Sequence, residues 1–270
     1  MTLKYDVAGT GPTLVLVHGV VHRRQAWDAV LPLLTPYRRV VTVDLPGHGE
    51  SAPLRESGEN VLVRLQIELT EFVREVEEPD QQVHIAGNSL GGFVALCLAA
   101  QGEVASATAL SPAGFFLNTA DQARTMATFR GMRAIARTLG GSAPTALKSR
   151  AVRYPSLLPF FARPSRVPYE AAVADVDSLT TNAMIDAGID APFEFPALTE
   201  PLVPVTVAWG TRDLILPRYQ SRNVRRVFPH ARMISVPGVG HVPMTDNPEL
   251  IASILLAGSE NAAESNAGVI

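Results

Sequence analysis

Short runs of apolar, mostly β-branched residues recur along the chain and end near glycine, proline or a polar residue. Six of these runs have the pattern of strands: Thr13–Val17, Arg39–Val43, Gln82–Ala86, Ala107–Leu110, Val205–Trp209 and Arg232–Val236. Because their residues are apolar on both faces, they are typical of strands buried in a parallel sheet. Between them lie helical patterns such as 60–78, where leucine, phenylalanine and valine return every three or four positions. The alternation predicts an α/β protein with a doubly wound, mostly parallel sheet.

The alternation of strands and helices stops in the middle of the chain, where helical patterns and prolines replace the strands. We therefore expect residues 113–200 to form an inserted, mostly helical cap. Residues 1–112 and 201–258 are then the two parts of one core domain. The tail 259–270 has no apolar period, and we expect it to be disordered.

The cap contains a predicted amphipathic helix over residues 121–139. Its buried face is predicted to carry five apolar residues: Phe129, Met132, Ile135, Ala136 and Leu139. The arginines at 130, 133 and 137 share another face, which we expect to be solvated. Residues 113–169 hold nine basic residues and one acid. This excess is either a solvated basic surface or a preference for anionic or lipid-like substrates.

The amino-acid composition limits the classes of molecule that the protein is expected to bind. The chain has 270 residues, of which 47% are hydrophobic and 18% charged, with a net charge of −3. This balance argues against a nucleic-acid partner and favours a small-molecule substrate. No signal peptide or run of 18 apolar residues is visible, so we expect a cytoplasmic protein without a membrane span. The single cysteine, Cys97, lies in an apolar helical run and is expected to be a core residue.

A glycine-rich motif follows the third predicted strand. Gly87–Gly92 reads Gly-Asn-Ser-Leu-Gly-Gly and opens a helical pattern, which is the setting of a G-x-S-x-G nucleophile elbow. Glycines are needed at positions 87 and 91 because side chains there would collide with the strand and the helix. The turn would lift the hydroxyl of Ser89 above the sheet, so we predict that Ser89 is a catalytic nucleophile.

A serine hydroxyl needs a base, and the base needs a group that orients it. His241 follows the last predicted strand, so it projects from the same carboxyl edge of the sheet as Ser89. Asp213 follows the strand before it and is the predicted acid, with Asp246 as the rival. The order serine, aspartate, histidine is the order found in α/β-hydrolases.

With these motifs in order, the sequence resembles the α/β-hydrolase superfamily, in particular its group of esterases, lipases and C–C hydrolases. The resemblance covers about 3–112 and 201–258 and includes His18-Gly and the stretch Asp44–Ser51. It implies an oxyanion hole built from the backbone N–H groups of Leu90 and Val20. No metal or organic cofactor is implied.

The resulting hypothesis is a serine hydrolase acting on a carboxylic ester, lactone or thioester through an acyl-enzyme. One alternative is a C–C hydrolase of a vinylogous diketone, for which Arg23 or Arg24 would meet a substrate carboxylate. The loop after His18 lacks the Gly-Pro-Gly element of such enzymes. A second alternative is a small-molecule receptor that keeps the triad with little turnover. The sequence leaves the substrate and the oligomeric state open.

Overall fold

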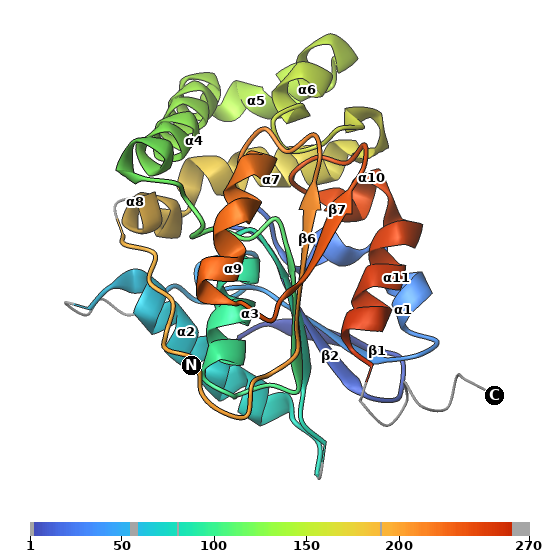
Figure 1. The fold of residues 1–270 in the computed structure, drawn as a ribbon. Helices are drawn as coiled ribbons and strands as arrows, with labels where there is room; N and C mark the ends of the chain where they lie inside the picture. The colour runs from blue at the N-terminus through green and yellow to red at the C-terminus, as the bar shows by residue number, and fades with distance from the viewer. Residues whose placement is uncertain (1–2, 55–58, 80, 190, 261–270) are drawn as a thin grey trace.

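Seven strands form one sheet at the centre of the molecule (Figure 1). The computed structural model describes residues 3–54, 59–79, 81–189 and 191–260. The strands are β1 (Tyr5–Ala8), β2 (Thr13–Val17), β3 (Arg39–Val43), β4 (His84–Asn88), β5 (Ser106–Leu110), β6 (Val205–Gly210) and β7 (Arg232–Val236). Their order in the sheet is β1-β3-β2-β4-β5-β6-β7, and all neighbours are parallel except β1 and β3. The predicted fold class is confirmed.

The buried central strands are those that the apolar runs predicted. Every residue of β2, β4, β5 and β6 is buried. Strand β1 was not predicted, and its four residues are all exposed. It pairs antiparallel with β3, with Tyr5 opposite Val43, and so forms an edge of the sheet. An exposed edge strand lacks the apolar run by which the other strands were recognised.

Helices cover both faces of the sheet. On one face lie α2 (Val61–Val76), α3 (Leu90–Ala100) and α9 (Val224–Val227), and on the other α1 (Leu31–Leu34) and α11 (Pro248–Gly258) (Figure 1). Helix α2 begins where Asn60 accepts a hydrogen bond from Leu62 N–H, and its predicted apolar face is buried. A short helix, α10 (Pro243–Asp246), precedes α11.

Helix α3 is buried on all sides, including Cys97. Burial raises the pKa of the Cys97 thiol, so the group stays neutral and packs as a core residue.

Helix α3, although apolar, has only 11 residues. In the part of the chain that the structure describes, no helix combines the length and the apolar character needed to cross a membrane.

Among the described residues between β5 and β6 there are five α-helices. We call residues 111–204 the β5–β6 segment. The helices are α4 (Thr119–Leu139), α5 (Ala143–Leu147), α6 (Arg150–Leu157), α7 (Tyr169–Thr181) and α8 (Ala183–Ile189). In Figure 1, α4 to α7 lie at the top of the molecule, beyond the end of the sheet where β6 points, and α8 lies to the left, above α2. Because parallel strands end at this edge, the segment lies over the edge that carries the site described below.

The faces predicted for helix α4 are wrong in part. Arg133 is 3% exposed, whereas Ile135 is 64% exposed. The Arg133 guanidinium donates hydrogen bonds to Leu179 O, to Asn182 O at 2.9 Å and to Asp186 at 2.8 Å. These carbonyls belong to the end of α7, where the last C=O groups lack partners within their helix. An arginine is buried here because it satisfies them.

The residue that directly follows α11 packs against the core. Ser259, the first residue of the segment expected to be disordered, is buried, and Arg38 donates to its Oγ and to its backbone oxygen, each at 3.0 Å. Residues 261–270, which make up most of that predicted tail, lie outside the described residues.

Candidate active site

Ser89 stands in the sharp turn between β4 and α3. Its φ of 56° and ψ of −115° lie where non-glycine residues are seldom found. The Ser89 N–H donates to Leu110 O at 3.0 Å, and the Ser89 carbonyl accepts from Phe93 N–H at 3.0 Å. Sheet and helix therefore hold the serine from both sides. Backbone strain of this kind persists only where the surroundings impose it, and it is concentrated at functional sites.

The turn closes because Gly87 and Gly91 have no side chains. A Cβ on Gly87 would lie 2.1 Å from Gly91 O, and a Cβ on Gly91 would lie 2.2 Å from Val17 O. Both distances are far below van der Waals contact, so a side chain at either position would push strand and helix apart. The predicted need for these two glycines is confirmed.

Asp213 and His241 meet in the loops that follow β6 and β7. His241 Nδ1 lies 2.8 Å from Asp213 Oδ2, and both side chains are buried. The other oxygen of Asp213 accepts backbone N–H bonds from Ile215 at 3.0 Å and Leu216 at 2.8 Å. Because a carboxylate faces Nδ1, the neutral ring carries its hydrogen there. Nε2 is then left as an acceptor on a ring that lines a cavity with Ser89.

Asp246, the rival acid, binds backbone N–H groups and not the ring of His241. One of its carboxylate oxygens accepts from Ala162 N–H at 2.9 Å and from Gly240 N–H at 2.7 Å, and the other accepts from Arg163 N–H at 2.7 Å. The side chain is fully buried. Asp246 thus joins the β5–β6 segment to the loop before His241 through backbone groups, and Asp213 is the acid at the imidazole.

Asn88, immediately before Ser89, is a residue whose role the sequence analysis missed. Its Nδ2 donates to Leu110 O at 3.0 Å and to His241 O at 2.8 Å. One buried amide therefore connects the serine turn, strand β5 and the histidine loop. The signal was present, because Asn88 belongs to the same motif, but its partners are distant in sequence.

Val20 and Leu90 border the same cavity as Ser89. Leu90 is the first residue of α3, so its N–H has no partner within the helix. Val20 lies in the loop after β2, and that loop passes close to the serine: a Cβ on Gly19 would lie 3.2 Å from Ser89 Cβ. The α3 N-terminus also directs the positive end of its dipole toward Ser89.

Two buried histidines support the loop that carries Val20. His18 Nε2 accepts from Leu45 N–H at 3.0 Å, so the hydrogen of the neutral ring is on Nδ1, 2.8 Å from Gly19 O. His48 Nε2 lies 2.8 Å from Val20 O. Burial lowers the pKa of His18 well below its ordinary value, and His48 lowers it further; burial also lowers the pKa of His48. The lowered pKa values favour the neutral form of both rings. His48 Nδ1 also lies 2.9 Å from Pro46 O, so the one hydrogen of its neutral ring is donated either to Pro46 O or to Val20 O.

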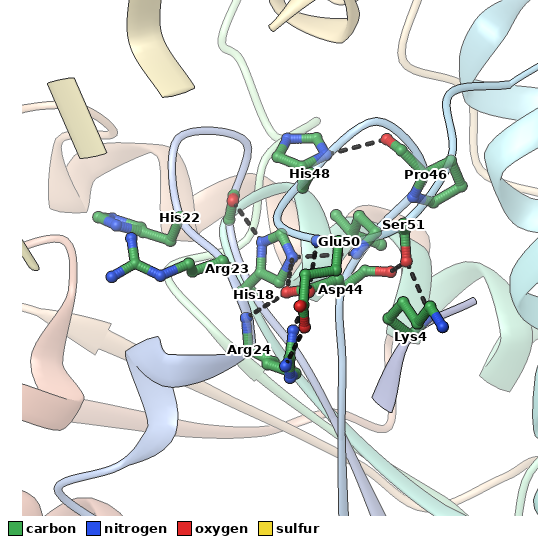
Figure 2. Close-up of polar contacts among 12 residues, drawn as sticks. Lys4, His18, His22, Arg23, Arg24, Asp44, Pro46, His48, Glu50 and Ser51 are labelled. Carbon is green, nitrogen blue, oxygen red and sulfur yellow. Dashed lines mark hydrogen bonds and ion pairs between the residues drawn. The ribbon is translucent and has the colours of Figure 1, made fainter. Parts of the chain in front are cut away.

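An ion-pair cluster fixes the far end of the same loop (Figure 2). The Arg24 guanidinium contacts Asp44, Asp6 and Glu50, and Asp44 also accepts from Arg24 N–H at 2.7 Å. Burial opposes the charge of Arg24, but its hydrogen bonds to Asp6, Glu50 and Asp44 raise the pKa of the guanidinium above its ordinary value. With these partners, Arg24 is a structural residue of the loop.

Two adjoining cavities meet at Ser89. The larger encloses about 550 Å³ of space, part of it open to solvent, and its lining is almost entirely apolar. It is lined by Val20, Leu62, Ser89, Leu90, Ala113, Phe116, Thr125, Met126, Phe129, Met184, Ile185, Gly188, Phe193 and Leu216. The smaller has about 180 Å³ of space between atoms, part of it open to solvent, and is too narrow to hold a water molecule; it adds His241, Phe160 and His22. The walls of the cavities come from α2, α4, α8 and several loops. The pattern of a single sequence does not predict that these segments lie next to one another.

Comparison with known proteins agrees with this geometry. A model of the "Alpha/beta hydrolase family" matches residues 14–254. The chain is 28% identical over 267 residues to the "Dihydrolipoyllysine-residue acetyltransferase component of acetoin cleaving system" of Pseudomonas putida, which covers 94% of this chain and 65% of that protein. The chain thus spans just under two thirds of that relative. It is 39% identical over 99 residues to a "Pimeloyl-[acyl-carrier protein] methyl ester esterase" of Aeromonas hydrophila, covering 37% of this chain and 36% of the esterase.

A solved structure shows the same fold. The crystal structure of a putative lipase from Acinetobacter baumannii superposes with a TM-score of 0.72 over 94% of this chain and 85% of the lipase. The two sequences are 24% identical. At this identity the likeness concerns the fold.

Proposed function

Because the chain belongs to the alpha/beta hydrolase family, we propose that it is a serine hydrolase that cleaves a carboxylic ester, lactone or thioester of a small molecule. The observation that carries the proposal is the Asp213–His241 pair at 2.8 Å, whose imidazole lines one small cavity with Ser89. The relative named as a methyl ester esterase supports the choice of an ester bond.

Ser89 is the nucleophile in this mechanism and His241 the general base. Nε2 of His241 takes the Ser89 proton as Oγ attacks the carbonyl carbon, and Asp213 stabilises the imidazolium that forms. The negative charge moves to the carbonyl oxygen of the tetrahedral intermediate. The N–H groups of Leu90 and Val20 stabilise it, and loss of one such donor costs about 2.7–4 kcal/mol in comparable enzymes.

The leaving group departs with the proton held by His241, which produces an acyl-enzyme on Ser89. Water then enters, His241 removes its proton, and the same steps release the carboxylic acid. Each attack places a proton on Nε2, first from Ser89 and then from water, and the bond cleavage that follows uses that proton, first for the leaving group and then for Ser89 Oγ, so these residues complete the cycle without a further acid or base.

The apolar cavity supports an apolar acyl group of medium length. Of its 14 lining residues, Ser89 and Thr125 are the two with polar side chains. Burial of a methylene group contributes about 0.8 kcal/mol. Each carbon that the cavity accommodates should therefore raise kcat/KM, up to the length at which the chain meets the far wall.

Residues 113–200 act in this proposal as a cap that sets substrate choice. Thr125, Met126 and Phe129 of α4 and Met184 and Ile185 of α8 line the apolar cavity. The core supplies the chemistry on its loops, and this segment supplies the opposite wall. Enzymes with such covers exclude water from the reacting bond when the cover is closed.

The C–C hydrolase alternative has less support. Arg24 is held by three carboxylates, and Arg23 lies 4.0 Å from Asp175, so neither is a free partner for a substrate carboxylate. We expect a 6-oxo-dienoate to be a poor substrate. A kcat/KM for such a dienoate about 100-fold above that for every ester tried, which is nearly 3 kcal/mol, would overturn the ester assignment and leave the nucleophile in place.

The proposed nucleophile is tested by labelling with a fluorophosphonate. The intact mass should rise by one adduct, and the adduct should map to the peptide with Ser89. Ser89→Ala should remain unlabelled, whereas Ser253→Ala, at an exposed position in α11, should be labelled like the native protein. Labelling without turnover of any ester would identify a receptor that keeps the triad, and an adduct on another residue would refute the proposal.

A further inference from the structure

The loop after β2 contains a tight turn that carries Val20, a proposed donor of the oxyanion hole. His22 N–H donates to Gly19 O at 3.0 Å, which closes a four-residue β-turn over 19–22. Val20 is the second residue of this turn, so the hydrogen bond of the turn does not use its N–H. The turn also passes close to the nucleophile, since a Cβ on Gly19 would lie 3.2 Å from Ser89 Cβ. The direction of the Val20 N–H therefore depends on what holds the turn.

Contacts from the core hold the loop at two places. At the first, His48 Nε2 lies 2.8 Å from Val20 O. At the second, the ion-pair cluster around Arg24 fixes the end of the loop. His22 and Arg23 lie between these two places, and Figure 2 shows their side chains extending away from the cluster. The fourth residue of the turn is thus held by something other than the cluster.

A carboxylate of helix α7 meets the His22 ring. Asp175 Oδ1 lies 3.2 Å from His22 Nδ1 and 4.0 Å from Arg23 NH1. The side chain of Asp175 is 14% exposed and that of His22 is 6% exposed, so solvent screens their contact little. The His22 ring also packs edge-on against Phe160 and Phe161, with 5.8 Å and 6.0 Å between the ring centroids. His22 therefore joins the turn to the β5–β6 segment.

Helix α7, which carries Asp175, is joined to helix α4. Arg133 of α4 donates to Leu179 O and Asn182 O at the end of α7. These bonds hold the helix that supplies Asp175 against the helix that lines the apolar cavity.

Asp175 itself stands back from the reacting atoms. Of the described residues that line the two cavities at Ser89, His22 is one and Asp175 is not. Any effect of the Asp175 carboxylate on the reaction must therefore pass through the loop that it contacts. The nearest part of that loop is the His22 ring, two residues beyond Val20.

We propose that Asp175 is a positioning residue of the oxyanion hole and acts through His22. The carboxylate holds the His22 ring, the ring holds the fourth residue of the turn, and the turn directs Val20 N–H at the carbonyl oxygen of the substrate. The inference rests on the proposed ester hydrolysis. A displaced donor stabilises the charge of the transition state less and leaves binding of the uncharged substrate nearly unchanged. Asp175→Ala should therefore lower kcat more than it raises KM.

Two substrates that differ in one atom isolate the oxyanion hole. In the thiono analogue of p-nitrophenyl hexanoate, sulfur replaces the carbonyl oxygen and is a weak hydrogen-bond acceptor. The measured quantity is the kcat/KM of the oxygen ester divided by that of the thiono ester. We expect Asp175→Ala to lower this ratio by about 5-fold or more, a part of the roughly 10²–10³-fold loss that removal of a whole donor causes. A defect in folding alone would lower both activities and leave the ratio unchanged.

Variants of His22 test the route from Asp175 to the turn. His22→Phe keeps an aromatic ring beside Phe160 and Phe161 but has no polar atom for Asp175, so the ratio should fall as in Asp175→Ala. The double variant should lose no more than the larger single loss, because both changes remove the same link. His22→Asn places an NH₂ near the position of Nδ1 and should keep most of the native ratio. Independent, additive losses in the double variant would contradict the route.

The matched control is Asp177→Ala, at an exposed position on the same helix and with the same change in charge. It should keep the native ratio. The inference is overturned if Asp177→Ala lowers the ratio as much as Asp175→Ala does. It is also overturned if the ratio stays native in both Asp175→Ala and His22→Phe. If Asp175→Ala does not fold, His22→Phe decides the outcome.

If the native protein cleaves neither ester, the proposed function fails, and the link is judged from the turn itself. The measurement is the backbone amide signal of Val20 in protein with ¹⁵N-labelled valine, assigned by its loss in Val20→Ala. A shift of this signal in both Asp175→Ala and His22→Phe, with none in Asp177→Ala, supports the link from Asp175 to the turn. An unchanged signal in both variants refutes it.

Discussion

At the scale of single residues, the histidine loop is held by three different groups with separate tasks. Asp213 meets the ring of His241, Asn88 holds its carbonyl, and Asp246 holds the N–H of Gly240. Asp213 lies 28 residues before His241 and Asp246 lies five residues after it, and both acids are buried. From sequence position, both aspartates were candidates for the acid that orients His241. Only the contact with Nδ1 distinguishes them. A side chain's hydrogen-bond partners are set by packing that no local pattern encodes.

Asp213→Asn should abolish most activity while leaving the fold intact. The remaining oxygen would keep the bonds from Ile215 and Leu216, and the new NH₂ would face His241 Nδ1, which favours the wrong tautomer. We expect kcat for a p-nitrophenyl ester to fall by about 10⁴-fold, with the melting temperature nearly unchanged.

Asp246→Asn is the matched comparison. Its NH₂ would face at least one backbone N–H that the carboxylate now satisfies, so we expect a loss of about 1–3 kcal/mol in the free energy of unfolding. Its loss of kcat should be much smaller than that of Asp213→Asn. The opposite pattern, with Asp213→Asn active and Asp246→Asn inactive but folded, would make Asp246 the acid.

The buried histidines predict how stability changes with pH. The native-state pKa values of His18 and His48 lie below the value of about 6.5 that histidine has in an unfolded chain. The unfolded state therefore takes up protons below pH 6.5 that the native state refuses. The free energy of unfolding should fall on acidification, by up to about 1.4 kcal/mol per pH unit for each ring.

This slope is measured by urea unfolding between pH 6 and pH 5. His18→Asn and His48→Gln should each have a shallower slope than the native protein, whatever their absolute stability. Native-like slopes in both variants at buried positions would mean that these rings are charged in the folded protein.

At the scale of elements, strands were easier to predict than helix faces. Buried parallel strands can be recognised in the sequence because both of their faces are apolar. Which face of α4 is buried depends instead on the carbonyl groups at the end of α7. Arg133 is buried because carbonyl groups at the end of α7 require donors, while Ile135 faces solvent. A helical wheel of α4 alone contains no information about α7. The apolar residues that do face inward include Met126 and Phe129.

Phe129 and Met132 on α4 form a matched pair for testing the acyl cavity. Phe129 lines both cavities at Ser89, whereas Met132 packs against the core and lines neither. Phe129→Ala should shift the preferred p-nitrophenyl ester toward longer acyl chains, because removal of the ring extends the cavity. The measurement is kcat/KM over a series of chain lengths.

Met132→Ala should lower the free energy of unfolding by less than the ~2–5 kcal/mol lost on truncation of a fully buried methionine, because Met132 is only half-buried. It should keep the native preference. Identical preference profiles in the two variants and the native enzyme would show that α4 packs against the site without selecting the substrate.

At the scale of the whole molecule, the topology brings the chemistry together. Ser89, Asp213 and His241 follow three strands that run parallel, so their loops emerge at one edge of the sheet. That is why motifs far apart in sequence could be assigned to one site. The cavity walls could not be predicted in this way. Their residues are ordinary apolar side chains from α2, α4 and α8, and only the packing of these helices over the edge selects them.

The central claim is that Ser89 carries the acyl group during turnover. The most direct measurement is the intact mass of enzyme mixed with p-nitrophenyl hexanoate and quenched with acid within the first turnover. Release of p-nitrophenol from an aryl ester is fast, so the acyl-enzyme should accumulate. We expect a mass increase of one hexanoyl group, mapped to the peptide with Ser89, together with a burst of p-nitrophenol and neither signal in Ser89→Ala. A burst without added mass, or a hexanoyl group on another residue, would contradict the account.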